Sequence, residues 1–213
     1  MVMPIDPALT LSQWFSPAYP VGAFAYSHGL EQAIADGDVE GPTSLHQWIA
    51  DVVHHGSGRN DALFLAAAYH ADDPAPLDAR LRAFVASKER LMEADLLGVA
   101  FADITASVTG HDLGGLTYPV AAGRAARLAG LPLPLTSAMF LQAFVTSLVS
   151  VGQRLIPIGQ TDGQKIIAAL APECAAIAQD TQTGDLDQLS STAFLSDIAA
   201  MRHETLTSRV FRT

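Results

Sequence analysis

The sequence predicts an all-α protein, a single-domain bundle of about eight to ten helices around one buried central helix. Between Arg127 and Arg154 the chain carries no Asp, Glu, Lys or Arg. Large apolar residues recur within that gap at helical spacing: Phe140, Phe144, Leu148 and Val151. A helix that is apolar over most of its circumference has to be surrounded by protein or by lipid. No segment shows the period-two alternation of a strand flanked by turns, so we expect no sheet.

Proline, glycine and capping residues divide the chain into the expected helices. Proline stops or opens a helix because it lacks an N–H, and glycine commonly ends one. In order, we expect helices over 7–15, 23–36, 43–55, 60–70, 77–107 with a bend near Ser87, 118–130, a central helix from 136 that ends before Pro157, a helix from Thr161 to Leu170, and helices over 173–182 and 192–203. Residues 1–213 then form one domain, in which 204–213 are a tail.

Composition and charge narrow the class of function. Of 213 residues, 49% are hydrophobic and only 16% are charged, against about 25% charged in ordinary soluble domains. This excess favours apolar surface that partners cover. The formal net charge of −10 without Lys/Arg clusters argues against nucleic acid and anionic membranes as partners. The single Cys174 excludes an intrachain disulfide and a multi-cysteine zinc site.

Two stretches bear on localisation. The first ten residues lack a basic segment followed by an apolar one, so we expect no signal peptide. The uncharged gap 128–153 is long enough to span a bilayer. Pro132, Pro134 and the hydroxyl and amide side chains that follow favour a buried helix instead. We therefore expect a cytoplasmic protein that does not enter a membrane.

The stretch GQTDGQK, 159–165, superficially matches a phosphate-binding loop. Its glycines, Gly159 and Gly163, are too close for that motif, and no hydroxyl follows the lysine. Thr161 and Gln164 instead have the spacing of a capping box that starts a helix.

Histidine-based chemistry receives little support from the sequence. Ser27-His28 resembles part of a hydrolase nucleophile elbow, but that elbow requires a preceding strand. A small serine hydrolase using this pair therefore stays an alternative that we do not favour. No histidine pair has the spacing of a closed metal site, so none is expected. His28 and His203 remain candidates for transient metal contact.

The tail has an unusual composition for a chain end. Arg209, Phe211 and Arg212 alternate charge with an aromatic ring, in a segment with no apparent core of its own. Arg and Phe are typical interface anchors, so we expect the tail to dock on a partner.

Five segments in order give the chain a family resemblance. They are SPAYPVGAFAYSHGLEQAI (16–34), SKERLMEADLLG (87–98), TYPVAAGRAA (117–126), RLIPIGQTDGQKIIAAL (154–170) and MRHETLTSRVFRT (201–213). Together they resemble the UreF family of urease accessory proteins. Val210, Thr213 and Lys165 depart from the family's usual residues.

The resemblance implies an all-helical protein without catalytic activity or a cofactor of its own. Members of this family form dimers and join UreD (also called UreH) and the GTPase UreG in a complex that delivers nickel to apo-urease. Nickel is then the cargo of the complex, and regulation of the UreG GTPase is a further expected role. The alternative hypothesis is a helical adaptor for another metalloenzyme maturation system.

The resemblance also implies roles for three groups of residues. The group that docks on the UreD-type partner comprises His203, Glu204, Arg209, Phe211 and Arg212. The group at the dimer and UreG surface comprises Arg154, Gly159, Gln160, Thr161, Asp162, Gly163 and Gln164. The third group carries the N-terminal family motif and comprises Pro20, Gly22, Tyr26, Ser27, His28 and Glu31.

Overall fold

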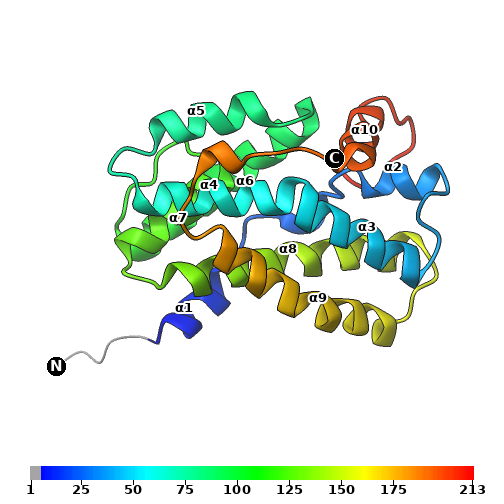
Figure 1. Ribbon diagram of the computed structural model, residues 1–213, viewed down its shortest axis with the longest axis horizontal. Coiled ribbons are helices and arrows are strands. Elements are labelled where there is room, and N and C mark those ends of the chain that lie inside the picture. The colour runs from blue at the N-terminus through cyan, green and yellow to red at the C-terminus, as the bar shows by residue number, and fades with distance from the viewer. Residues whose placement is uncertain (1–5) are drawn as a thin grey trace.

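The computed structural model describes residues 6–213, which form α-helices and no strand (Figure 1). The all-α prediction is confirmed. Residues 1–5, on which the signal-peptide expectation partly rests, lie outside the described residues. The elements are α1 (Pro7–Trp14), η1 (Ala23–Ala25), α2 (Leu30–Ala35), α3 (Pro42–His55), α4 (Ser57–His70), α5 (Ala75–Phe84), α6 (Lys88–Thr109), α7 (Tyr118–Leu128), α8 (Leu133–Leu155), α9 (Gln160–Asp180), η2 (Leu186–Gln188) and α10 (Phe194–His203).

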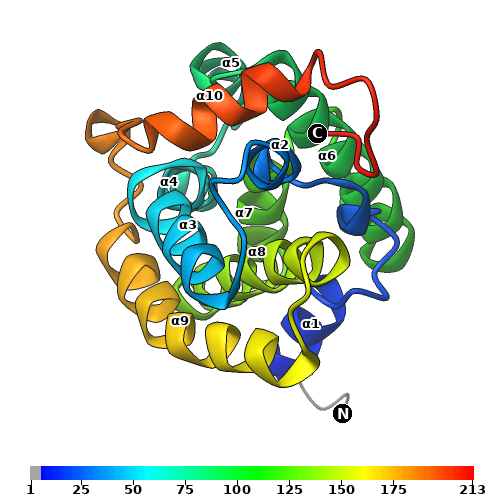
Figure 2. The ribbon, with the colours of Figure 1, turned by 90° about the vertical axis from the view of Figure 1, so that its right-hand side faces the viewer.

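Helix α8 is the predicted central helix, and it lies inside the bundle (Figure 2). It packs against α1, α2, α3, α4, α7 and α9. Its first half places Phe140 in an apolar cluster with α4, α6 and α7. From Leu141 onward, α8 places Leu141, Val145 and Leu148 in another cluster with α2, α3 and α9. By length and composition α8 could cross a membrane, and its contacts with six helices account for the same apolar composition.

Several predicted boundaries are confirmed. The bend near Ser87 is the junction of two helices, because Ser87 is the N-cap of α6 and its hydroxyl accepts a hydrogen bond from the Arg90 N–H. Gly110 ends α6 in the left-handed conformation that glycine adopts without strain.

Other boundaries were predicted wrongly. Helix α9 continues through Pro172, where we expected a break. The carbonyl that loses its hydrogen bond there is that of Ala168, an exposed residue whose carbonyl water can solvate. The expected capping box is also absent, because α9 starts one residue earlier and Gly159 is its N-cap. Helix α4 begins at Ser57, so only Gly56 interrupts the chain between α3 and α4.

Two glycines let helices and loops approach closely. A Cβ at Gly123 on α7 would collide with the backbone carbonyl of Leu65 on α4. A Cβ at Gly98 on α6 would collide with the Leu116 carbonyl. Since backbone atoms cannot move aside as a flexible side chain can, these positions fix the spacing of α4, α6 and α7.

We expect Gly123→Ala to lower the free energy of unfolding by about 2 kcal/mol or more, because the added methyl overpacks the contact with α4. Gly41→Ala is the matched control, since an added Cβ there meets no atom within 4 Å. The control should cost less than about 1 kcal/mol. Urea unfolding measures both, and equal stability of the two variants would contradict the close approach.

Candidate functional site

The C-terminal tail folds back onto its own chain. After α10, residues 204–213 turn over α6 and return beside α2 (Figure 2). Phe211 is only 4% exposed and belongs to the second apolar cluster. The expectation that the tail has no core of its own is therefore wrong, because its aromatic ring is buried within the same molecule.

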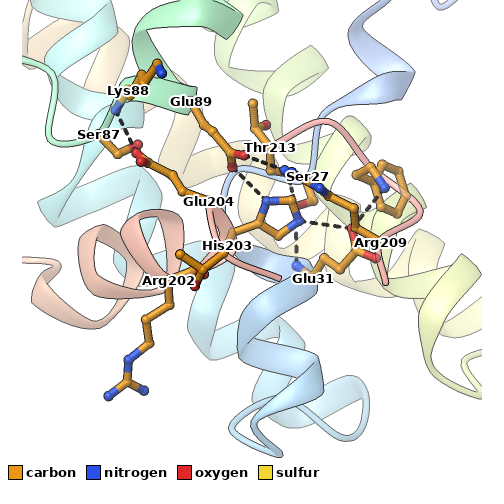
Figure 3. A network of polar contacts seen from close by, with 12 residues as sticks. Ser27, Glu31, Ser87, Lys88, Glu89, Arg202, His203, Glu204, Arg209 and Thr213 are labelled. Atoms are coloured by element: carbon orange, nitrogen blue, oxygen red, sulfur yellow. Dashed lines mark hydrogen bonds and ion pairs between the residues drawn. The ribbon is translucent and has the colours of Figure 1, made fainter. Parts of the chain in front are cut away.

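Glu31 is the main attachment point of the tail. Its carboxylate accepts hydrogen bonds from the backbone N–H groups of Val210 (2.6 Å) and Phe211 (2.9 Å). His203 Nε2 lies 3.1 Å from the same carboxylate, as Figure 3 shows. Glu31 is buried, so these partners compensate a carboxylate that has little access to water.

A second carboxylate, Glu89 on α6, completes the network. Its carboxylate accepts a hydrogen bond of 2.6 Å from Arg209 Nη1. The same carboxylate lies 2.7 Å from His203 Nδ1 (Figure 3). His203 is fully buried between Glu31 and Glu89, with one ring nitrogen facing each carboxylate. Glu204 adds a bond outside this pair, because its carboxylate accepts the Lys88 N–H at 3.0 Å. The network thus ties α2, α6, α10 and the tail together.

Backbone bonds join the tail to the N-terminal motif. The Arg212 N–H donates to the Ala25 carbonyl, and the Ser27 N–H donates to the Thr213 carbonyl, each at 2.8 Å. The Ser27 hydroxyl donates to the same Thr213 carbonyl. Burial raises the pKa of the neighbouring Tyr26 phenol, and Arg212 partly offsets this effect. The motif residues Tyr26, Ser27 and Glu31 therefore meet the tail.

The other motif residues shape the backbone. Gly22 and Gly29 adopt positive φ values of 79° and 80°. A Cβ at Gly29 would lie 2.7 Å from the Ala200 nitrogen, so this glycine lets α10 approach α2 closely. Pro20 is exposed and stands apart from the network.

The predicted dimer and UreG surface divides into two places. Arg154 lies against the tail, with its guanidinium 5.7 Å from the centre of the Phe211 ring and a hydrogen bond of 3.3 Å to the Phe24 carbonyl. The loop residues lie at the start of α9, where Gly163 packs against Gln153. The side chains that remain exposed there are Gln160, Thr161 and Gln164. Asp162 pairs with Lys165 at 3.0 Å.

His28 belongs to a buried charge cluster that also contains Asp61 on α4 and Arg90 and Glu93 on α6. Arg90 contacts Glu93 at 2.6 Å and Asp61 at 3.6 Å. His28 Nδ1 lies 3.5 Å from Glu93, and its Nε2 bonds the Ser57 hydroxyl. His28 therefore faces Ser57 and Glu93, whereas Ser27 bonds the tail, which contradicts the hydrolase alternative.

The cluster strongly perturbs its titratable groups. Burial raises the pKa of Asp61 to about 7, against the opposing effect of Arg90. Burial also acts to raise the pKa of Glu93, but Arg90 and His28 outweigh it and bring that pKa to about 2. Burial, helped by Arg90, lowers the pKa of His28.

The sequence alone did not identify Glu89 or the partners of His28 as site residues. Glu89, Arg90 and Glu93 lie within the segment 87–98 that carried part of the family resemblance, and that is the signal that could have indicated them. Within residues 6–213, no group of three or more His, Cys, Asp or Glu side chains is placed to hold a metal ion. The hydrogen bonds described above occupy both ring nitrogens of His203 and Nε2 of His28.

Comparison with known proteins gives these contacts a family context. The family model UreF matches residues 39–171. The chain belongs to the UreF family. It is 56% identical over 209 residues to the urease accessory protein UreF of Ruegeria pomeroyi, covering 96% of each chain. It is 48% identical to that of Roseobacter denitrificans, covering all of this chain and 97% of the relative.

The UreF-family chain also has an unusual exposed surface on α10. Its large apolar side chains point outward and are 44–66% exposed; they are Phe194, Leu195, Ile198 and Met201. Its inward side chains are small or polar; they are Ser196, Ala199, Ala200 and His203. Amphipathic helices ordinarily bury their apolar face. We call the four outward residues the α10 apolar face.

A groove adjoins the α10 apolar face. It has a volume of about 360 Å³ and is lined by Trp48 and Val52 of α3 together with Phe194 and Leu195. The buried indole Nε1 of Trp48 has no hydrogen-bond partner in the part of the chain that the structure describes. The apolar face and the groove form one continuous surface, since they share Phe194 and Leu195.

We expect Glu31→Gln to loosen the tail, because the neutral amide replaces the buried carboxylate that holds Val210, Phe211 and His203. Losing about 1.4 kcal/mol of this charge-assisted bonding would raise the open population about tenfold. Limited trypsin cleavage after Arg209, followed by mass spectrometry, measures that population. Glu173→Gln is the control, since Glu173 bonds His54 outside the network. Equal cleavage of the two variants would contradict the role of Glu31.

Proposed function

We propose that this chain is a non-catalytic scaffold of urease maturation. It joins a UreD-type protein and the GTPase UreG in a complex that delivers nickel into apo-urease. Membership of the UreF family, whose relatives are named as urease accessory proteins, supports the urease system over another metalloenzyme. Nickel is the cargo of this complex, and the chain acts in the cytoplasm as a homodimer.

The observation that carries this proposal is the α10 apolar face. A contiguous apolar surface on a soluble protein commonly marks a protein-binding site. The four residues recur at positions i, i+1, i+4 and i+7, so they cover about two helical turns on one side of α10. We assign this face and the adjoining groove to the UreD-type partner.

The tail has a supporting role in this proposal. Its residues Arg209 and Phe211 are engaged within the chain, so they act by positioning α10 against α2 and α6. His203 is both the last residue of α10 and the centre of the Glu31–Glu89 network. Loss of the tail would therefore remove the support of the partner-binding face.

We assign the contact with UreG, and the dimer contact, to the C-terminal end of α8 and the start of α9. Arg154 lines a groove of about 430 Å³ between α1 and α8, and Phe24 at this groove is strongly exposed. Gln160, Thr161 and Gln164 are exposed nearby in the sequence. Through such a contact, this chain would regulate the GTPase activity of UreG.

Replacing Ile198 and Met201 together by Gln should abolish binding of the UreD-type partner, because two of the four apolar anchors are lost. We expect at least a tenfold drop in co-purification from cells that also express the UreD-type partner, and a matching drop in the nickel content of urease. Leu9→Gln is the control, since Leu9 is a large apolar residue on α1 that is even more exposed (65%) than Ile198 or Met201.

Two results would contradict different parts of the proposal. A folded double variant that binds the partner as well as Leu9→Gln would make the α10 assignment wrong. A urease whose nickel content does not depend on the wild-type chain, with UreD and UreG present, would make the proposed function wrong.

A further inference from the structure

The buried charge cluster contains more negative than positive charge. His28, Arg90 and Glu93 are each less than 10% exposed, and the Asp61 side chain is 13% exposed. One guanidinium faces two carboxylates, and burial lowers the pKa of His28, which disfavours a second positive charge there. An uncompensated charge inside a protein costs several kcal/mol, so the closed structure favours one proton on the cluster.

Asp61 is the group that holds this proton. Arg90 contacts Glu93 at 2.6 Å but Asp61 only at 3.6 Å, so the guanidinium stabilises the ionised form of Glu93 more than that of Asp61. The pKa values of about 7 for Asp61 and about 2 for Glu93 agree with this geometry.

The C-terminal segment, residues 194–213, covers the cluster from two sides. At one side the Thr213 hydroxyl donates to Glu93 at 3.2 Å. At the other side, Ser196, Asp197 and Ala200 of α10 line a cavity of about 100 Å³. That cavity is also lined by His28, Asp61 and Arg90. Asp197 thus lines the same cavity as Asp61, and its carboxylate accepts a hydrogen bond from the Ser191 hydroxyl.

A second cavity of about 60 Å³ shares His28, Asp61 and Arg90 with the first. A cavity of more than about 15 Å³ with polar walls can hold a water molecule. Both cavities are large enough for water, which would carry protons between Asp61 and the solvent. Proton exchange at Asp61 therefore does not require the whole fold to open.

We propose that the C-terminal segment is held closed by the proton on the buried charge cluster and opens when that proton is lost. With Asp61 ionised, the carboxylates of Asp61 and Glu93 share the one guanidinium of Arg90, and Asp197 of α10 lines the cavity beside them. Opening of the segment admits water to these groups and relieves the repulsion. The segment includes the α10 apolar face, so its closure would regulate partner binding.

The direction of the pH dependence follows from linkage. The groups that face Asp61 are Arg90 and Glu93 from α6, His28 from the turn before α2, and Asp197 from α10. The closed state raises the pKa of Asp61 from 3.8 to about 7, so it binds the proton more tightly than a hydrated open state. Opening therefore becomes more favourable as the pH rises from 3.8 to about 7, and levels off above it.

Hydrogen exchange measured by mass spectrometry on the purified full chain tests this inference. Between about pH 6 and pH 8.5, the opening constant of the segment should rise about tenfold. The protection of peptides from 194–213 against hydrogen exchange, corrected with an unstructured reference peptide, should fall by that factor. The protection of peptides from α8 should not change. Asp61→Asn, which mimics the protonated acid, should abolish the fall. Asp103→Asn, an exposed carboxylate on α6, should leave it unchanged.

Three outcomes overturn the inference: protection of 194–213 that does not change with pH, an equal fall in α8, or a fall that persists in Asp61→Asn. If Asp61→Asn does not fold, trypsin cleavage of the wild type after Arg202 and Arg209 tests the proposal instead. The ratio of this cleavage rate to that of a free peptide should rise about tenfold over the same pH range. A constant ratio overturns the proposal.

Discussion

Within residues 6–213, side chains of the single helix α8 take part in both apolar clusters. Phe140 packs into the first cluster, and Leu141, one residue later, packs into the second. The second cluster also contains Phe211 of the tail, and Arg154 near the end of α8 covers its ring. The position of the tail, and with it the orientation of α10, therefore depends on the packing of the central helix. The packing of the core thus determines where the surface proposed for partner binding lies.

Much of this fold could be predicted because its helices obey local rules. The uncharged, periodic stretch that includes Phe140 and Leu148 predicted α8, and Ser87 predicted the junction of α5 and α6. The errors arose where tertiary context or solvation outweighed a local preference. Pro172 is tolerated inside α9 because the carbonyl it leaves free belongs to an exposed residue, Ala168, and Gly159 rather than Thr161 is the N-cap of that helix.

The site was only partly predictable, because its bonds join residues far apart in sequence. The motif around Glu31 and the tail around Phe211 were each recognised, but nothing in their spacing indicated that they bind one another across 180 residues. Asp61, Arg90 and Glu93 lie on helices, where charged residues usually face water. Their burial depends on α10, which no local pattern in α4 or α6 reveals.

The pairing of Glu31 with residues 210 and 211 has a consequence for biosynthesis. Residues 203–213 leave the ribosome well after 25–31, so the carboxylate of Glu31 stays unmatched until those later residues have emerged. Helix α10 is held against α2 and α6 only from that moment. A partner that recognises α10 would thus distinguish chains from which residues 203–213 have emerged from shorter nascent ones.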